Sequence, residues 1–290
     1  MKKIRAFSRS PMGTTLMFMV AVLLLMTGTI GGVRATPQIF NPDFAYGGVE
    51  LDQIGITLVE SVDGEWTNVS WRDYDKDSES FVVNSNSSDP KMGVILQNLD
   101  NMIPAGEQFK IGYAYPDVLA VKNSGTIPEY VRVTIYKYWV AEDPETGEKT
   151  RFDVYDSNGE DILNKLIELN FPEGNGWVRD PDPTTNTAER TVLYYKYKVP
   201  SATTATDPDD IYTNPFITTV RIKDEILDYG EKVYTNTDKT AWTWSWVADG
   251  LEFRIEAWAD GVQDHNARAA MKSAWGLTDA QIDSFGIVFG

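Results

Sequence analysis

Four acidic residues at alternate positions are the first feature of this sequence that could do chemistry. They are Asp73, Asp75, Asp77 and Glu79. Closely spaced carboxylates supply the oxygen ligands that Ca²⁺ prefers, so this run is a candidate calcium site. It departs from an EF-hand loop, because Ser78 stands where that loop needs glycine and Asn84 stands where it needs a bidentate glutamate. The alternative interpretation is a solvated, charged strand or loop.

His265 is the only histidine in the chain. A zinc site with two histidines therefore cannot be built within one chain, and a Ser-His-Asp triad would depend on this one residue. His265 lies between an expected strand and the start of an expected helix, where a histidine usually caps the helix or satisfies a buried amide. The sequence contains no HExxH, GxSxG, phosphate-loop or dinucleotide-binding motif. We expect no catalytic residue, and no cofactor other than the calcium ion considered above.

The charge balance argues against one class of partner. The chain has 26 Lys and Arg against 43 Asp and Glu, and the first 35 residues hold five of the basic residues and no acidic one. The chain after residue 35 therefore carries a net charge of −22. Such a surface repels phosphate backbones, so we expect no nucleic-acid partner. The chain also has no cysteine, which excludes disulfides, thiolate metal sites and a cysteine nucleophile.

The first 35 residues have the pattern of a secretory signal peptide. Basic residues between Lys2 and Arg9 precede an apolar run from Leu16 to Thr27, and the small-residue site Val33-Arg34-Ala35 follows. This order predicts export, with cleavage by a signal peptidase after Ala35. The apolar run is shorter than the ~20 residues that a membrane-spanning helix needs, so an uncleaved anchor is the weaker interpretation.

Residues 36–48 are predicted to form an extended N-terminal arm. The segment contains two prolines and ends in Gly47-Gly48, which lets the backbone turn away from the domain that follows. An apolar arm without an obvious place in its own domain can pair with the sheet edge of a neighbouring subunit. The residues that we expect to make this assembly contact are Ile39, Phe40, Phe44, Tyr46, Val49 and Leu51. Residues 49–290 are predicted to form a single domain.

The run from Val121 to Val140 predicts the central strand of that domain. After Pro128 the residues alternate strictly, with Val131, Val133 and Ile135 in one phase. The other phase carries tyrosines and hydroxyl-bearing residues. Because successive side chains of a strand point to opposite faces, the aliphatic phase faces a core and the other phase faces outward.

The rest of the domain is predicted to be mainly β, with a few short helices. Strand patterns occur at residues 49–59, 191–199, 216–222 and 285–289, and residues 161–169 have the spacing of a short amphipathic helix. Residues 266–275 predict a helix that ends at Gly276, with Asp264 or Asn266 as its cap. A capping box from Thr278 to Gln281 predicts another helix.

Residues 242–257 give the clearest hairpin pattern. Trp242, Trp244 and Trp246 share one phase, and Asp249-Gly250 is a tight-turn signal before a second alternating run. Three tryptophans at a period of two usually cover a core or an interface. A ladder that binds carbohydrate is the alternative interpretation.

Four stretches of the chain carry a resemblance to a known family: Val121 to Gly125, Tyr130 to Trp139, Val262 to Ala267 and Ser273 to Gly276. They are similar to the TasA/camelysin family of exported proteins of Gram-positive bacteria. The match runs through most of the chain after the predicted signal peptide, and residues 107–140 and 251–276 are its specific parts. It implies a jelly-roll-like antiparallel β-sandwich with a few short flanking helices. It also implies assembly into biofilm matrix fibres, in which the N-terminal strand of one subunit completes the sheet of the next. The sequence departs from the family at Thr36-Pro37-Gln38, which come before the apolar residues of the arm.

The function that we expect from these features is structural. The chain is predicted to be secreted to the extracellular matrix or cell surface of a Gram-positive bacterium and to form filaments of its own copies, in contact with other matrix or cell-surface proteins. The runner-up is a camelysin-like cell-surface metallopeptidase, although no zinc motif is present to receive that activity. A carbohydrate-binding surface module is the third candidate.

Overall fold

The computed structural model describes residues 54–62, 64–70, 72–75, 80–83, 96, 103 and 109–289. All of them belong to one compact unit, Leu51–Gly290. The predicted signal peptide, the arm of residues 36–48, and Val49 and Leu51 lie outside the described residues.

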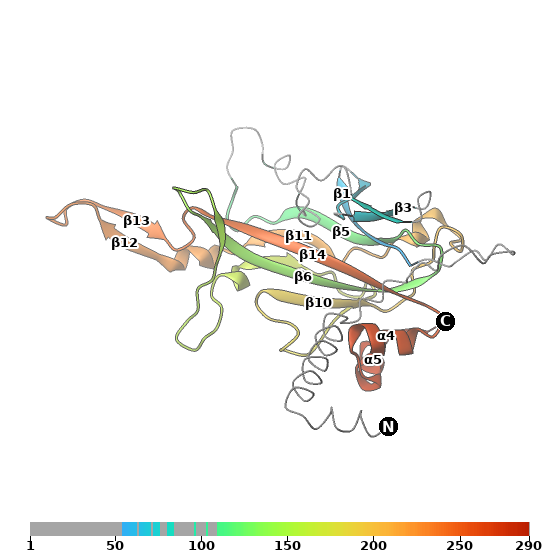
Figure 1. Cartoon of the computed structure of the whole chain (residues 1–290). Helices are drawn as coiled ribbons and strands as arrows, with labels where there is room; N and C mark the ends of the chain where they lie inside the picture. The colour runs from blue at the N-terminus through green and yellow to red at the C-terminus, as the bar shows by residue number, and fades with distance from the viewer. Residues whose placement is uncertain are drawn as a thin grey trace, which may run out of the picture. The chain divides into compact units, whose positions relative to one another are not determined.

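Two antiparallel five-stranded sheets form the body of the domain (Figure 1). The first sheet has the order β2 (Glu65–Asn68), β1 (Ile56–Val62), β5 (Tyr115–Asn123), β11 (Ile217–Ile222) and β8 (Ile167–Asn170). The second sheet has the order β14 (Leu251–Gln263), β6 (Glu129–Glu142), β10 (Arg190–Tyr195) and β9 (Trp177–Arg179), with β7 (Lys149–Phe152) also paired to β6. The predicted mainly β, sandwich-like fold is thus confirmed.

The remaining elements are short. Two further hairpins are β3 (Arg72–Asp75) with β4 (Ser80–Val83), and β12 (Gly230–Tyr234) with β13 (Trp242–Trp246). The 3-10 helices are η1 (Asn164–Leu166), η2 (Pro208–Ile211) and η3 (Asp224–Tyr229), and the α-helices are α4 (Ala267–Trp275) and α5 (Asp279–Phe285). The chain crosses between the two large sheets after β5, β7, β8 and β10, and again from β11 to β14 by way of β12 and β13.

The core lies between the two sheets. It is built from aliphatic and aromatic side chains of both, with Leu119 and Ile217 from the first sheet facing Val133 and Ile135 of the second. The alternation of β6 has the predicted phase, because its odd-numbered residues from Val131 to Ile135 are almost completely buried. Its even-numbered residues point to the outer face of the second sheet.

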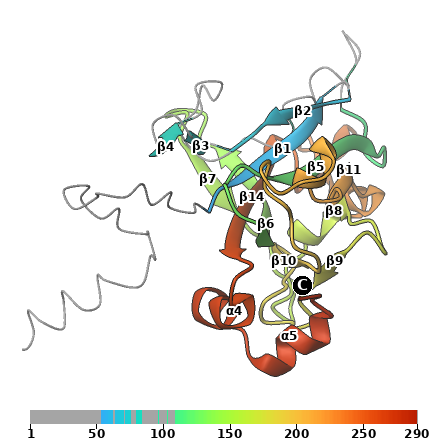
Figure 2. The same ribbon diagram turned by 90° about the vertical axis from the view of Figure 1, so that its right-hand side faces the viewer.

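The helices α4 and α5 cover one end of that outer face (Figure 2). Tyr130 and Tyr194 pack against Met271 of α4 and Phe285 of α5, and the rings of Tyr194 and Phe285 stack with centroids 4.6 Å apart. The hydroxyl of Tyr130 donates a hydrogen bond to the carbonyl of Val288 at 2.8 Å. Tyr130 is therefore buried by a second, smaller core, although it points away from the main one.

The ends of these helices follow the sequence signals in part. Thr278 and Gln281 form the predicted capping box, each side chain accepting a hydrogen bond from the other's amide. Gly276 ends α4 in the left-handed conformation, with φ 72°, as predicted. The N-terminal cap of α4 differs, because Asn266 takes the cap position with φ 58° and its side chain accepts no capping hydrogen bond.

The predicted hairpin of residues 242–257 is wrong in its pairing. Both strands exist, but β13 pairs with β12, whereas β14 pairs with β6 over all thirteen of its residues. A long partner that buries Ile255 and Ala257 in the core outweighs the short local partner. Asp249-Gly250 still turns the chain, with Gly250 at φ 75°, but it redirects the chain from one sheet to another.

Two further local predictions are wrong. Residues 161–169 form η1 followed by β8 instead of an amphipathic helix. The carbonyls of Leu163 and Ile167 accept hydrogen bonds from the side chains of Trp139 and Lys137, and β8 adds an edge to β11, so tertiary pairing overrides the helical spacing. The segment after Phe285 forms no strand, and its amide at Val288 bonds to the carbonyl of Lys196.

Gly261 allows the two sheets to approach each other closely near the end of β14. A Cβ atom at this position would lie 2.6 Å from Cγ1 of Ile56 and would also collide with the carboxylate of Glu129. Ile56 is the first residue of β1, and Glu129 is the first residue of β6. The absence of a side chain at residue 261 therefore fixes the spacing of β1, β6 and β14.

We predict that Gly261→Ala destabilises the domain by about 1–3 kcal/mol, because the added methyl group overpacks the core. Urea denaturation followed by circular dichroism measures this loss. The second change Ile56→Val removes Cδ1, which would lie 3.1 Å from the added Cβ atom, and is expected to restore part of the stability. An unchanged urea midpoint in Gly261→Ala would show that the approach of the strands is not tight.

Candidate functional site

Two of the four residues of the predicted calcium site belong to the described part of the chain. Asp73 and Asp75 lie in β3, which pairs with β4, so the alternating pattern there belongs to a strand. Asp77 and Glu79 lie outside the described residues. In the described parts of the chain, no group of three or more His, Asp or Glu residues is arranged to hold a metal ion. The proposed calcium site stays a prediction.

His265 lies between β14 and α4, as predicted, and its side chain is exposed. It therefore does not satisfy a buried amide, which was one of the two expected roles, and the cap position of α4 is taken by Asn266 instead. The neighbouring Asp264 forms an ion pair with Lys198 at 3.6 Å, and its carbonyl accepts a hydrogen bond from the amide of Ala267. This surface turn joins the second sheet to the helices.

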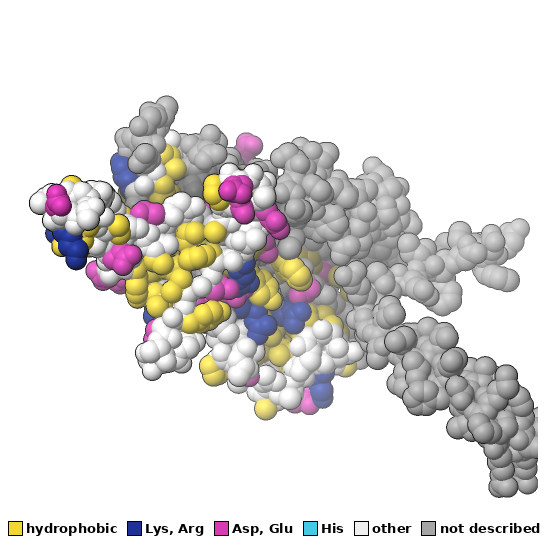
Figure 3. All heavy atoms as spheres, turned by 60° about the vertical axis from the view of Figure 1, so that its left-hand side comes forward, with side chains coloured by type: hydrophobic (Ala, Val, Ile, Leu, Met, Phe, Trp, Pro, Cys, Tyr) yellow, Lys and Arg dark blue, Asp and Glu magenta, His cyan; other side chains and the backbone are white. Residues whose placement is uncertain are grey.

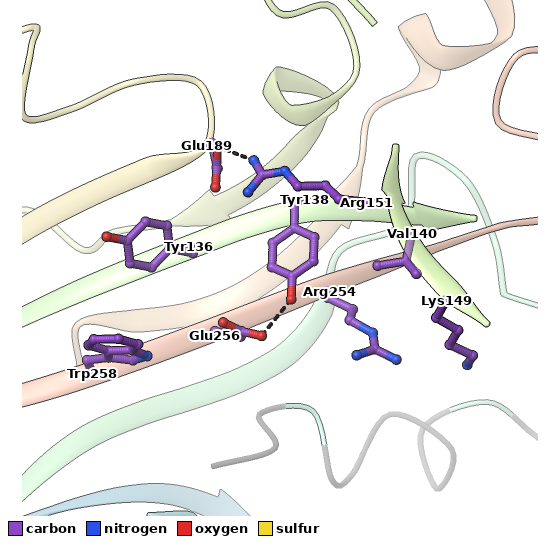
Figure 4. Close-up of a pocket in the computed structure, with 9 residues that line it drawn as sticks. All are labelled: Tyr136, Tyr138, Val140, Lys149, Arg151, Glu189, Arg254, Glu256 and Trp258. Carbon is purple, nitrogen blue, oxygen red and sulfur yellow. Dashed lines mark hydrogen bonds and ion pairs between the residues drawn. The ribbon is translucent and has the colours of Figure 1, made fainter. Parts of the chain in front are cut away.

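A shallow groove of about 380 Å³ lies on the outer face of the second sheet, away from the helices. It is lined by side chains from β6, β7, β14 and the segment before β10: Tyr136, Tyr138, Val140, Lys149, Arg151, Glu189, Arg254, Glu256 and Trp258 (Figure 4). The β6 members are the outward-facing, aromatic phase that the sequence predicted. The groove itself was not predicted, because it depends on which strands flank β6.

The charged side chains of the groove are paired within the groove or with Glu252 beside it. The hydroxyl of Tyr138 donates to Oε1 of Glu256 at 2.6 Å, and Arg151 pairs with Glu189 while its guanidinium lies 5.1 Å from the centroid of the Tyr138 ring. Burial, together with the Glu256 carboxylate, raises the pKa of Tyr138 to about 12, so this phenol stays a neutral donor. These cross-strand pairs stabilise the outer face of the sheet and occupy most of its polar groups.

The free edge of β14 is the longest sheet edge in the described part of the chain. In an antiparallel pair, hydrogen-bonded residue pairs alternate with pairs that are not bonded. The amide of Asp264 bonds to the carbonyl of Pro128, in the same register as the ladder between β14 and β6. The even-numbered amides of β14 therefore point to β6, and the odd-numbered amides from Phe253 to Gln263 point away from it.

No described strand pairs with this outer side of β14. The other strands at the ends of the two sheets, β2, β8 and β9, have four, four and three residues, whereas β14 has thirteen. Long unpaired edges are templates for another strand, and proteins usually keep their edges short for that reason. The side chains of Ile255 and Ala257 are buried in the core, so this edge is also held rigidly in place.

Three acidic side chains are buried in the sandwich. Glu60 of β1 and Asp117 of β5 lie on the core-facing side of neighbouring strands, and Glu129 begins β6. Oε1 of Glu129 accepts a hydrogen bond from the amide of Gly55 at 2.8 Å. The carbonyl of Gly55 in turn accepts from the amides at residues 124 and 125. Glu129 thus holds the point where the chain enters β1.

Burial shifts the ionisation of these groups. Burial, with a smaller contribution from the neighbouring Glu60, raises the pKa of Asp117 to about 8. Burial also raises the pKa of Glu129 to about 8, although the hydrogen bond from Gly55 acts in the opposite direction. Burial and nearby cations lower the pKa of Lys137 to about 8, and its amine donates to the carbonyl of Ile167. Neutral forms are therefore favoured inside the sandwich.

Comparison with known protein families, curated proteins and solved structures finds no match for this chain. The resemblance to the TasA/camelysin family therefore stays a hypothesis that rests on the residues quoted above. None of the helices in the described ranges is long and apolar enough to cross a membrane.

Sequence reasoning missed the two features that the structure makes most conspicuous. The edge of β14 could not be recognised, because the alternating run 251–257 was paired with the wrong strand. The buried acids were missed because Glu60, Asp117 and Glu129 look like ordinary charged residues in strands that alternate. One signal was present in the sequence. Each of the three acids occupies the same set of alternate positions, odd or even, as the core residues of its own strand.

We predict that acidification stabilises the domain between about pH 8 and pH 5. In this range the unfolded chain has released protons from Asp117 and Glu129, whereas the folded chain keeps them, so the free energy of unfolding falls as the pH rises. The lowered pKa of Lys137 acts with the opposite sign, but only above about pH 8. Urea denaturation at the two pH values measures the difference.

Asp117→Asn and Glu129→Gln provide the matched variants for this experiment. Each replaces an acid with a neutral group of the same shape, so each is expected to reduce the dependence of the urea midpoint on pH. A wild-type midpoint that is equal at the two pH values, or lower at pH 5, contradicts the account of the buried carboxyls.

We predict that His265→Gln leaves any chelator-sensitive proteolytic activity of the purified protein unchanged, because the side chain is exposed at a surface turn. Cleavage of casein with and without EDTA measures this activity. The control is wild-type protein from the same purification. Loss of an EDTA-sensitive activity in the variant alone would favour the metallopeptidase.

Proposed function

We propose that this chain is an exported structural protein that assembles into extracellular fibres by donation of its N-terminal arm to a neighbouring subunit. The observation that carries the proposal is the free edge of β14. It offers outward backbone groups on a rigid, thirteen-residue strand. The arm of residues 36–48 has the same length, so one arm can satisfy one edge.

The composition of the arm suits an added strand. Pro42 has no amide hydrogen, so its backbone must face away from β14, and the odd-numbered residues 39–47 would then form the ladder. In a strand added parallel to β14, this register places Phe40, Phe44 and Tyr46 on the core-facing side of the sheet, together with Ile255 and Ala257. Burial of each such side chain contributes about 1.5–3 kcal/mol. Three of them, together with the ladder, can offset the ~4–15 kcal/mol that association costs.

Charge favours a head-to-tail contact over direct pairing of two β14 edges. On the outer face of β14 the acidic residues Glu252, Glu256 and Asp260 outnumber its one basic residue, Arg254, so two paired copies of this strand would place an excess of acidic residues together. The arm carries only one acidic residue, Asp43. A contact between two different surfaces that does not close into a ring produces a filament.

We predict that deletion of residues 36–46 abolishes filaments, because the variant loses its donor and keeps its acceptor edge. The deleted residues precede the described domain, so the variant is expected to remain folded and monomeric by circular dichroism and sedimentation. Negative-stain electron microscopy of the mature protein and of the variant, at equal concentration, measures assembly. Filaments of the truncated protein would overturn the proposal.

Ala259→Pro tests the acceptor edge in the same assay. It removes one outward amide and leaves the even-numbered ladder to β6 intact, a place where a proline is tolerated. Ala259→Val is the matched control, because it keeps the amide, and it is expected to form filaments. An equimolar mixture of Ala259→Pro and the truncated protein is expected to form dimers only, because the first supplies the arm and the second supplies the intact edge of β14. A mixture that stays monomeric would contradict a contact between the arm and this edge.

A further inference from the structure

The β12–β13 hairpin is a two-stranded sheet that belongs to neither of the two large sheets. Directly paired residues of antiparallel strands lie on the same side, and Tyr234 pairs with Trp242 while Lys232 pairs with Trp244. Together with Trp246, these residues form one side of the hairpin, here termed the tryptophan face. Figure 1 shows the hairpin at the end of the sandwich opposite α4 and α5.

The tryptophan face is exposed. Trp242, Trp244 and Tyr234 expose 49%, 48% and 45% of their surface, and Leu227 and Tyr229 of the adjacent η3 are exposed as well. Figure 3 brings this end of the molecule forward and shows hydrophobic side chains interspersed with charged ones. The three tryptophans therefore do not cover the core, whereas the interface that the sequence also predicted stays a prediction. A concentration of exposed aromatic residues at one place is typical of a binding surface.

The rings are held in place before any ligand arrives. Trp246 lies against Gly230, where a Cβ atom would come within 2.7 Å of its indole nitrogen. Trp244 stacks on Trp246 with centroids 6.4 Å apart, and the ammonium of Lys232 lies 4.3 Å from the centroid of the Trp242 ring. Preorganised side chains lose little conformational entropy when they bind.

The base of the hairpin is anchored to the sandwich. The amide of Val247 donates to the carbonyl of Tyr229, and the amide of Trp246 donates to Oδ2 of Asp249 at 3.0 Å. Val247 and Ala248 pack against the main core. The hairpin therefore presents its rings from a fixed base.

The charge of the hairpin identifies the class of ligand. Residues 230–246 contain two acidic residues, Glu231 and Asp238, and two basic ones, Lys232 and Lys239, so the hairpin is neutral in a strongly acidic chain. A polyanion would be repelled by the rest of the protein, and a polycation finds no excess negative charge on this face. The surface is suited to an uncharged ligand.

We propose that the tryptophan face binds a neutral polysaccharide. The C–H faces of sugar rings pack on the negative faces of indole rings, and Lys232 at the centre of the face can donate to hydroxyl groups. Trp242 is turned by 86° relative to Trp244, which suits a chain whose successive sugar units differ in orientation. Lysine is depleted from the centres of protein interfaces, which disfavours a second copy of the chain as the occupant.

Biolayer interferometry of the mature protein on surfaces coated with glucomannan, mixed-linkage β-glucan, xylan or dextran tests this proposal. Binding to at least one of these neutral polymers is expected, with none to an alginate surface. The double variant Trp242→Ala/Trp244→Ala is expected to bind at least tenfold more weakly. The control Trp258→Ala removes an equally exposed tryptophan, 51%, from the groove and is expected to bind like the wild type.

Three outcomes would overturn the proposal: no binding to any of the four neutral polymers, equal binding by the double variant, or equal loss in Trp258→Ala. Sedimentation velocity of the wild type and double variant, each carrying the deletion of residues 36–46, tests the competing occupant. A dimer that becomes a monomer only in the double variant would assign the face to a second copy instead. Because the arm is absent from both proteins, this result is independent of fibre assembly.

Discussion

Strand β6 forms hydrogen bonds on both of its sides, and much of the domain is arranged by that constraint. Its odd-numbered backbone groups bond toward β10, as the amide of Lys137 does with the carbonyl of Glu189, and its even-numbered groups bond toward β14. Its odd-numbered side chains enter the core, whereas its even-numbered side chains line the outer face. The alternation of β6 thus determines which of its side chains form the core and which line the groove or pack against the helices.

Because β14 pairs with β6 on one side, its other side has no partner strand among the described residues. A strand that is paired on one side only keeps half of its backbone groups available, and β14 keeps them over an unusual length. Its side chains are nevertheless fixed, because Ile255 and Ala257 belong to the core. A rigid edge that cannot be removed without loss of the core is a suitable acceptor for the strand of a neighbour. This is the physical basis of the proposed fibre.

The elements whose residues carry their own signal could be predicted from the sequence. The alternation of Val131, Val133 and Ile135 identified β6 and its inner face, and Thr278 with Gln281 identified the start of α5. Partners could not be predicted in this way. The pattern at residues 251–257 indicates a strand, but it does not indicate the partner. The strand pairs with thirteen residues of β6 instead of with the five-residue β13 that precedes it. Tertiary pairing also determines the structure of residues 161–169, which have helical spacing but form a short 3-10 helix and an edge strand.

Polar groups inside the sandwich show a second limit of sequence reasoning. Glu129 is buried because Gly55 needs an acceptor and because Gly261 leaves room for its carboxyl group. Neither reason is visible near residue 129 in the sequence. The tryptophans show the reverse case: their spacing was compatible with a core or an interface, and the structure excludes only the core, because the hairpin that carries them belongs to neither large sheet.

Hydrogen exchange of the β14 amides shows whether the outer side of this strand accepts the arm of a neighbouring subunit. In the monomer, the amides of Ile255, Ala257 and Ala259 are expected to exchange faster than those of Arg254, Glu256 and Trp258, which bond to β6. In filaments the two sets are expected to be equally protected, because an added strand satisfies the outer side of the edge. Protection of the odd-numbered amides in the monomer, or their rapid exchange in filaments, would contradict the account.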